Sequence, residues 1–106
     1  MQEGVLARIR RAVENGEYRF SSHADEEADA ERITMAEVRE ALLTGQVLED
    51  YPDHRRGPCC LIYGRTSQGR DVHVVLSTGP LPLTVVTVYE PKPPRWRTPT
   101  ERGSRA

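Results

Sequence analysis

Residues 59–91 read CCLIYGRTSQGRDVHVVLSTGPLPLTVVTVYEP, and this stretch decides the fold. It holds three runs rich in apolar and β-branched residues, which span about 59–65, 71–77 and 83–89. Turn clusters at 66–69 and 78–80 separate the runs. Runs of this kind, joined by short polar connections, are typical of consecutive antiparallel strands. The stretch therefore predicts three neighbouring strands of one sheet.

Two helical patterns open the chain. Apolar residues form an amphipathic stripe over residues 3–14, and Asn15-Gly16 is a helix stop signal. A second, short helix is predicted to begin with Ser22 as its N-cap and Asp25 at its third position. This helix is strongly acidic, and its apolar seam consists of alanines. The small seam predicts close packing against the sheet or against the next helix.

A third helix has clear boundaries in the sequence. Thr34 and Glu37 have the spacing of a capping box, which opens the helix. Gly45 is predicted to close it in the C′ position.

Two further strands are predicted at residues 18–21 and 46–51. In the second of these, Val47 is expected to share one face with Glu49 and Tyr51. The element order is then α–β–α–α–β–β–β–β. Helices gathered early and strands gathered late predict an α+β domain, with N-terminal helices packed on a mostly antiparallel sheet of four to five strands.

The chain divides into an N-terminal helix (1–17), a central domain (18–91) and a Pro/Arg-rich C-terminal tail (92–106). Prolines recur from Pro91 onward and cannot continue the interior of a sheet. The tail is therefore predicted to be extended, and disordered beyond Trp96.

Size and composition indicate a small soluble domain. The 106 residues suffice for one domain with one modest core. Without a membrane-length apolar run or a signal-peptide pattern, we expect a cytoplasmic protein with no membrane partner. Adjacent residues of a strand point to opposite faces, so Cys59 and Cys60 are not expected to form a disulfide. One thiol is expected in the core and the other half-exposed.

The net charge of −1 hides an uneven distribution. Residues 1–58 carry 13 acids and 8 bases, a net of −5, and residues 59–90 carry two of each. Residues 91–106 carry five bases and one acid, a net of +4. Nearly all the bases are arginines, which suit phosphate contacts, although a GC-rich genome produces the same bias.

A group of polar residues in the three strands can do chemistry if one face of the sheet is open. His73 lies in an apolar run, with Thr87 and Tyr89 on the following strand and Tyr63 and Arg65 on the preceding one. On one open face they could handle a phosphodiester, since arginine neutralises phosphoryl oxygens while histidine or tyrosine transfers the proton. A histidine on an apolar strand is more often a satisfied structural residue. The same side chains would then belong to a core.

Two other histidines and the cysteines are weaker candidates. His23 lies in the first turn of the second helix, where the helix dipole favours a neutral imidazole that can act as a general base. Its alternative role is to cap the helix or pack against the sheet. Pairs of His and Cys show no standard metal-ligand spacing, so neither a metal nor a cofactor is expected.

Many short motifs of residues 18–96 together resemble one protein family. They are Ser22-His23-Ala24, Ile33-Thr34, Val38, Ala41-Leu42, Gly45, Glu49-Asp50-Tyr51-Pro52-Asp53, Arg56-Gly57-Pro58, Cys60-Leu61, Gly64-Arg65-Thr66, Gly69-Arg70, Val72-His73-Val74-Val75, Thr87-Val88-Tyr89-Glu90-Pro91 and Trp96. In these motifs the chain is similar to an uncharacterised bacterial and archaeal domain family, grouped with toxins of the RelE/barnase–colicin-like ribonuclease superfamily.

The resemblance implies helices followed by a four-stranded antiparallel sheet, and metal-independent RNA cleavage by acid–base residues and arginines on the sheet face. It also implies an antitoxin partner of the small zinc-finger or helix-turn-helix type. The candidate catalytic residues that match the family motifs are His23, Arg65, His73, Tyr89 and Glu90. Many relatives carry an arginine shortly after the His-Ala pair, where this chain has Glu26-Glu27. The acidic helix would also repel RNA.

Three functions follow from these patterns. The first is the endoribonuclease toxin of a type II toxin–antitoxin pair, which cleaves single-stranded RNA with His23 or His73 as the proton acceptor or donor. In that reading Tyr89 orients the histidine and Arg65 holds the phosphate. The second is a non-catalytic protein-binding module on the same fold, favoured by the acidic helix and the near-neutral charge, because ribonuclease toxins are usually basic. A metal-dependent hydrolase is the third.

Overall fold

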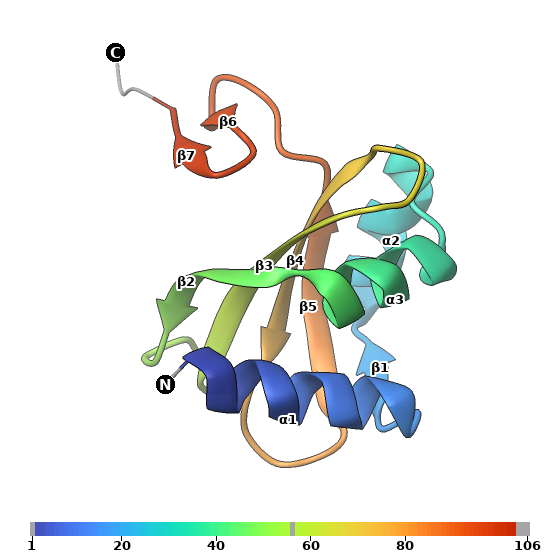
Figure 1. Ribbon diagram of the computed structural model, residues 1–106, viewed down its shortest axis with the longest axis vertical. Coiled ribbons are helices and arrows are strands. Elements are labelled where there is room, and N and C mark those ends of the chain that lie inside the picture. The colour runs from blue at the N-terminus through green and yellow to red at the C-terminus, as the bar shows by residue number, and fades with distance from the viewer. Residues whose placement is uncertain (1, 56, 104–106) are drawn as a thin grey trace.

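The computed structural model describes residues 2–55 and 57–103 and has the predicted α+β architecture (Figure 1). Its elements are α1 (Gln2–Glu14), β1 (Tyr18–Phe20), α2 (Ser22–Glu31), α3 (Met35–Thr44), β2 (Gln46–Tyr51), β3 (Cys59–Arg65), β4 (Asp71–Ser77), β5 (Leu83–Tyr89), β6 (Trp96–Thr98) and β7 (Glu101–Arg102). The bounds of β3, β4 and β5 coincide with the three predicted runs. Within the described ranges, no helix has the length and apolar character needed to cross a membrane.

Five strands form one sheet in the order β1-β5-β4-β3-β2. The chain runs from β2 to β5 as an antiparallel meander, which places β4 at the centre of the sheet. β1 joins the far edge and pairs with β5 in parallel. The sheet is therefore mostly antiparallel, as predicted.

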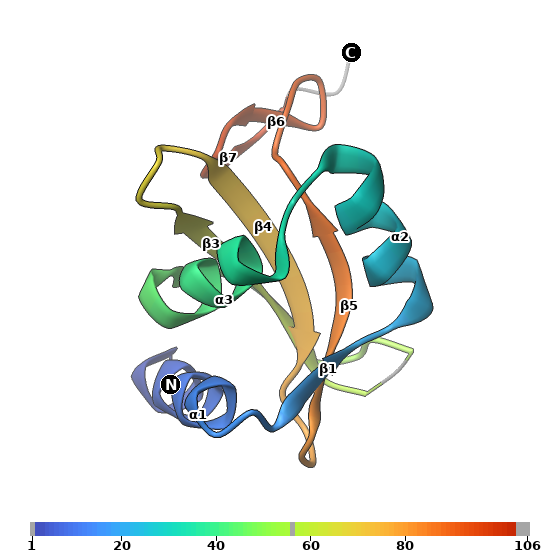
Figure 2. The ribbon, with the colours of Figure 1, turned by 90° about the vertical axis from the view of Figure 1, so that its right-hand side faces the viewer.

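All three helices lie on one face of the sheet, which we call the helix face (Figure 2). Alternate residues of β4 and β5 point toward the helices, because successive side chains of a strand point to opposite faces. The main buried cluster joins these strand residues to the apolar stripes of the helices; among its members are Ile9, Val13, Val38, Leu42, Ile62, Val72, Val74, Leu76, Val85 and Val88. The opposite face of the sheet, which we call the open-side face, carries His73.

Side-chain caps mark where α2 and α3 begin. The capping box of α3 is confirmed: the Glu37 backbone N–H donates to Thr34 Oγ1 at 3.0 Å, and the Thr34 N–H donates to Glu37 Oε1 at 2.9 Å. In α2 the cap is Ser21, one residue earlier than predicted, and its Oγ accepts from the Ala24 N–H at 3.1 Å. The Ser21 N–H donates to the Val85 carbonyl at 2.9 Å, which ends the β1–β5 ladder and fixes where α2 begins.

Two details of the α3–β2 connection differ from the sequence prediction. Gly45 ends α3 in an extended conformation (φ −84°, ψ −174°) and not in the left-handed C′ conformation. A side chain at Gly45 would collide with the Tyr63 carbonyl oxygen, so glycine is needed there for close packing. A β-bulge at Leu48 then changes the phase of β2. Val47 therefore packs on the helix face, while Tyr51 packs on the opposite face.

The free edge of β5 is covered by carboxylates from α2. β1 pairs only with Leu83 to Val85, so the backbone of β5 beyond that point has no strand beside it. Glu27 Oε1 accepts from the Val88 N–H at 2.9 Å, and Glu31 Oε1 accepts from the Glu90 N–H at 2.9 Å. The two glutamates lie one helical turn apart and take the place of a missing strand.

The C-terminal tail differs from the expectation of disorder beyond Trp96. β6 and β7 form a two-stranded hairpin, in which Trp96 pairs with Arg102 (Figure 1). Trp96 is 2% exposed and packs with Cys59, Leu61 and Val75 on the open-side face. Cys60 is buried in the helix-face cluster, so the expectation of one half-exposed thiol is also wrong.

We predict that Gly64→Ala destabilises the fold while Gly4→Ala does not. A Cβ at Gly64 would lie 2.5 Å from the Cα of Ala41, where α3 packs against β3. Overpacking of this kind costs about 1–3 kcal/mol. A Cβ at Gly4, in α1, meets nothing within 4 Å, and alanine there should add about 0.5–1 kcal/mol through helix propensity. Urea unfolding of both variants measures the difference, and equal midpoints would contradict the packing.

Candidate functional site

His73 occupies the middle of β4 on the open-side face and is surrounded by aromatic rings. It pairs across the sheet with Tyr63 on β3 and with Tyr89 on β5. The centroid of its ring lies 5.8 Å from that of Tyr63, 5.2 Å from that of Tyr89 and 4.5 Å from that of Trp96. The side chain is 0% exposed. These four residues are called the His73 cluster below.

Both ring nitrogens of His73 have partners, and the partners define the tautomer. Nε2 lies 2.7 Å from the Pro99 carbonyl oxygen, which can only accept, so Nε2 carries the proton. Nδ1 is then an acceptor, and the Tyr89 hydroxyl donates to it at 3.2 Å. The Tyr89 oxygen in turn accepts from the Trp96 indole N–H at 3.1 Å. Hydrogen bonds therefore run in one direction from Trp96 through Tyr89 and His73 to the Pro99 carbonyl.

Burial keeps His73 and Tyr89, the two ionisable groups in this series of hydrogen bonds, neutral. The pKa of His73 is lowered below its usual 6.5 because the buried site disfavours the imidazolium, and the Pro99 hydrogen bond offsets this only in part. Burial likewise raises the pKa of the Tyr89 hydroxyl. His73 is therefore a neutral imidazole near pH 7, which is the form that a general base requires.

The tail hairpin is fastened over this face by Arg102. Its guanidinium donates to both carboxylate oxygens of Glu49 on β2, from Nε at 2.9 Å and from Nη2 at 2.6 Å. It also stacks over the Trp96 ring at 4.5 Å. Arg102 holds the pKa of Glu49 below its usual value, and the Tyr51 hydroxyl donates to the same carboxylate. The Arg102–Glu49 pair is called the latch below.

Arg65 lies on the same face but at its rim. Its side chain is 60% exposed and pairs with Asp71 on β4 at 2.9 Å. The Tyr63 hydroxyl donates to the same Asp71 oxygen at 2.6 Å. Arg65 therefore approaches the His73 cluster through Tyr63 without touching the imidazole.

The other two predicted site residues lie elsewhere. His23 is 62% exposed on α2 and pairs with Glu27 at 3.2 Å, on the far side of the β5 edge. Glu90 follows β5 and pairs with Arg70 at 3.5 Å and Lys92 at 3.9 Å. A cavity of about 310 Å³ between α2 and the tail is lined by Glu27, Glu90, Tyr89 and Trp96, among others. Tyr89 and Trp96, two members of the His73 cluster, thus also line this cavity.

Comparison with protein families gives a match over most of the chain. Residues 20–90 match the family described as Domain of unknown function (DUF4258). The chain belongs to the DUF4258 family. No curated protein and no solved structure matches the chain. The matched region contains every predicted site residue, whereas the hairpin that closes the His73 cluster lies outside it.

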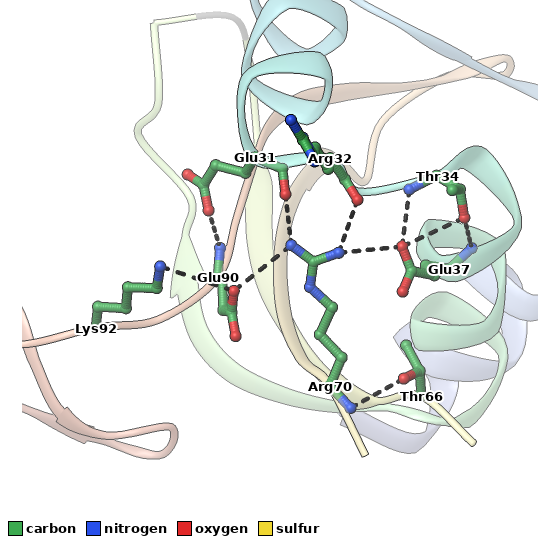
Figure 3. A network of polar contacts seen from close by, with 8 residues as sticks. All are labelled: Glu31, Arg32, Thr34, Glu37, Thr66, Arg70, Glu90 and Lys92. Carbon is green, nitrogen blue, oxygen red and sulfur yellow. Dashed lines mark hydrogen bonds and ion pairs between the residues drawn. The ribbon is translucent and has the colours of Figure 1, made fainter. Parts of the chain in front are cut away.

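Arg70 connects the helices of this DUF4258 chain to the sheet (Figure 3). Its guanidinium donates to the Glu31 carbonyl at 2.5 Å and to the Arg32 carbonyl at 2.7 Å, at the C-terminal end of α2. It also pairs with Glu37 in the first turn of α3 and with Glu90 after β5. This network gives Glu90 a structural role, and the catalytic role predicted for it stays a prediction.

Sequence reasoning assigned no role to several residues that shape the site. The spacing of Glu27 and Glu31 by one helical turn is a signal that α2 presents both carboxylates to one neighbour. Arg102 carried no signal of its own, since its partner Glu49 lies 53 positions away in sequence. Trp96 was the available clue, because a lone large aromatic after the last strand needs a surface to cover it.

We predict a pH dependence of stability that belongs to His73. Its folded pKa lies below the unfolded value of about 6.5, so below that pH the unfolded chain binds more protons than the folded chain. The stability that this pKa shift of His73 contributes is fully present above about pH 6.5, and it is lost as the pH falls toward the folded pKa. The slope reaches at most about 1.4 kcal/mol per pH unit.

Urea unfolding of the wild type and of His73→Gln, from about pH 8 to about pH 5, tests this slope. The variant should lose less stability per pH unit below about pH 6.5 than the wild type. Above that pH the two slopes should agree, which is the internal control. Equal slopes over the whole range would show that His73 is not held neutral.

We also predict that Arg70→Gln destabilises the fold far more than Arg39→Gln does. Removing the Arg70 guanidinium leaves two carbonyls and two carboxylates without their shared donor. Hydrogen bonds to charged groups contribute about 1.5–3 kcal/mol each, so a loss of at least about 2 kcal/mol is expected. Arg39 is exposed on α3, and its substitution should change stability by less than about 0.5 kcal/mol. A difference below about 1 kcal/mol between the two variants would contradict the role of the network.

Proposed function

We propose that this DUF4258 chain is a metal-independent endoribonuclease of the toxin type, with His73 as its acid–base group. The observation that carries the proposal is a neutral imidazole, oriented by Tyr89, on a sheet face that also presents Arg65. An acid–base group oriented by a second side chain, with a cation on the same surface, is the arrangement that phosphodiester cleavage needs. The tail hairpin closes the site in the described structure, so the proposed enzyme is latent.

The proposed reaction uses the ribose 2′-hydroxyl as its nucleophile. Neutral His73 takes the 2′-hydroxyl proton while the 2′-oxygen bonds to the adjacent phosphorus. The bond from phosphorus to the 5′-oxygen breaks, and that oxygen takes up a proton from solvent water. The His73 imidazolium then returns its proton to solvent. The products are a 2′,3′-cyclic phosphate and a 5′-hydroxyl end. Arg65, on the rim of the same face, would neutralise the phosphoryl oxygens, whereas His23 lies across the β5 edge and has no part in this scheme.

A second candidate function is a protein-binding module without catalysis. The observation in its favour is the outward side of α2, where Asp25, Glu26 and Asp29 are all exposed. This acidic side faces solvent, while Glu27 and Glu31 are engaged with β5. Such a surface suits a basic protein partner. Binding of a basic protein that is lost in an Asp25→Asn/Asp29→Asn variant, together with intact RNA in the assay below, would favour this second function.

We predict that opening the site activates RNA cleavage. Trp96→Ala removes the main apolar anchor of the hairpin, so this full-length variant should cleave single-stranded RNA in the presence of EDTA faster than the wild type. Adding His73→Gln to Trp96→Ala should reduce the rate by about 100-fold or more, since general acid–base groups contribute about 10²–10⁴. The assay measures 2′,3′-cyclic phosphate ends on a labelled oligonucleotide.

His23→Gln in the Trp96→Ala background is the matched control, because it removes a histidine outside the proposed site. Its rate should stay within about twofold of the Trp96→Ala rate, against the loss of about 100-fold expected for His73→Gln. Circular dichroism verifies that each variant is folded. Intact RNA with folded Trp96→Ala, or equal rates with and without His73, would overturn the proposal.

A further inference from the structure

We propose that the tail hairpin, residues 96–102, is an autoinhibitory strap that single-stranded RNA releases by drawing Arg102 away from Glu49. The inference rests on the proposed function, because the group that the strap closes is His73. It adds what controls the site: the polyanion that would be the substrate is also the signal that opens it.

The strap blocks the imidazole directly. Its Pro99 carbonyl occupies His73 Nε2 at 2.7 Å, and its Trp96 ring lies edge-on to the imidazole at 4.5 Å between ring centroids. Together with the flanking tyrosines this leaves His73 with no exposed surface. No substrate atom can reach Nε2 until Pro99 has moved.

The strap also fixes the wrong tautomer for a base. The Pro99 carbonyl can only accept, so the proton stays on Nε2 of His73. The Tyr89 hydroxyl, whose oxygen accepts from the Trp96 indole, then donates to Nδ1. A protonated Nε2 cannot accept a proton from a 2′-hydroxyl. When the strap leaves, Nε2 loses the Pro99 acceptor and the Tyr89 oxygen loses the Trp96 donor. Tyr89 can then accept from Nδ1–H, and Nε2 can carry the lone pair. Release of the strap thus frees the imidazole sterically and switches its tautomer.

Phosphate can compete with Glu49 for the guanidinium of Arg102. Arg102 holds Glu49 through a fork of two hydrogen bonds, and phosphate oxygens match the same fork. Its side chain is 52% exposed and can be reached from solvent. The Arg102 end of this ion pair is exposed, so salt and other anions can compete for it. A two-stranded hairpin has little stability of its own, so Trp96 and the latch hold the strap in place.

The charge of the tail selects a chain of phosphates over a single anion. Arg95 and Arg97 are exposed beside Arg102, on a tail whose net charge is +4. Arg97 pairs with Glu101 of the strap itself, at 3.2 Å. A flexible single strand can contact several of these arginines together, and each contact releases bound counterions.

The fluorescence of Trp96 tests the inference, because Trp96 is the only tryptophan of the chain. An oligouridylate of about 20 nucleotides, titrated into the wild-type protein, should shift the emission to longer wavelength as Trp96 enters water. The RNA affinity should fall with salt at a log–log slope of about −2, from about 0.7 for each of three phosphate contacts. RNA that binds without moving the Trp96 emission, or that does not bind at all, overturns the inference.

Glu49→Gln tests the latch, with Asp50→Asn as its matched control on the same strand. Loss of the ion pair should lower the RNA concentration at half-maximal shift by about threefold, whereas Asp50→Asn should leave it unchanged. An unchanged midpoint in Glu49→Gln overturns the latch.

The readout separates this inference from the proposed function. An RNA-dependent shift of Trp96 with no cleavage by the Trp96→Ala variant would overturn the nuclease and leave the strap standing. Cleavage by Trp96→Ala with no RNA-dependent shift in the wild type would do the reverse.

Discussion

Burial of the central strand on both faces is the constraint on which the rest of the structure depends. β4 carries Val72, Val74 and Leu76 toward the helices, and His73 and Val75 toward the other side, and all five side chains are buried. One layer of helices can cover only one of these faces. The tail must therefore fold back, and it must bring a hydrogen-bond partner for the imidazole as well as apolar surface, since a buried polar group without partners is costly. Trp96 and the Pro99 carbonyl meet these two needs.

The edge of the sheet next to α2 imposes a second requirement, which explains an unusually acidic helix. The N–H groups of Val88 and Glu90 have no strand beside them, and Glu27 and Glu31 accept their hydrogen bonds. Glu27 and Glu31 would repel RNA if they faced solvent, but both are engaged in hydrogen bonds within the fold. Arg70 completes the arrangement by tying the end of α2 to α3 and to Glu90. The acidic side chains are therefore divided between structure and solvent along a single helix.

Local patterns predicted the elements well, and contacts distant in sequence were missed. The strand bounds of the meander and the capping box of α3 depend on neighbouring residues, so periodicity and capping rules suffice for them. The phase of β2 depends on a bulge at Leu48, which no periodicity shows. The tail was predicted to be disordered because its prolines and arginines have no local partner. Its order comes from Glu49 and His73, which precede Arg102 by 53 positions and Pro99 by 26. Val72 to Leu76 did hold a clue, since a nearly continuous apolar run indicates burial on both faces.

The near-neutral charge of the chain argued against an RNA-handling protein, and the proposed strap offers another explanation for it. The tail carries a net +4 and the first 58 residues a net −5. In the described structure Arg102 forms an ion pair with Glu49, and Arg97 forms one with Glu101. The near-neutral net charge then corresponds to the closed state, in which basic and acidic side chains are paired with one another. If RNA releases the strap as we propose, the tail cations and His73 become exposed together. The movement that opens the imidazole would then also create the positive surface that a phosphate backbone requires.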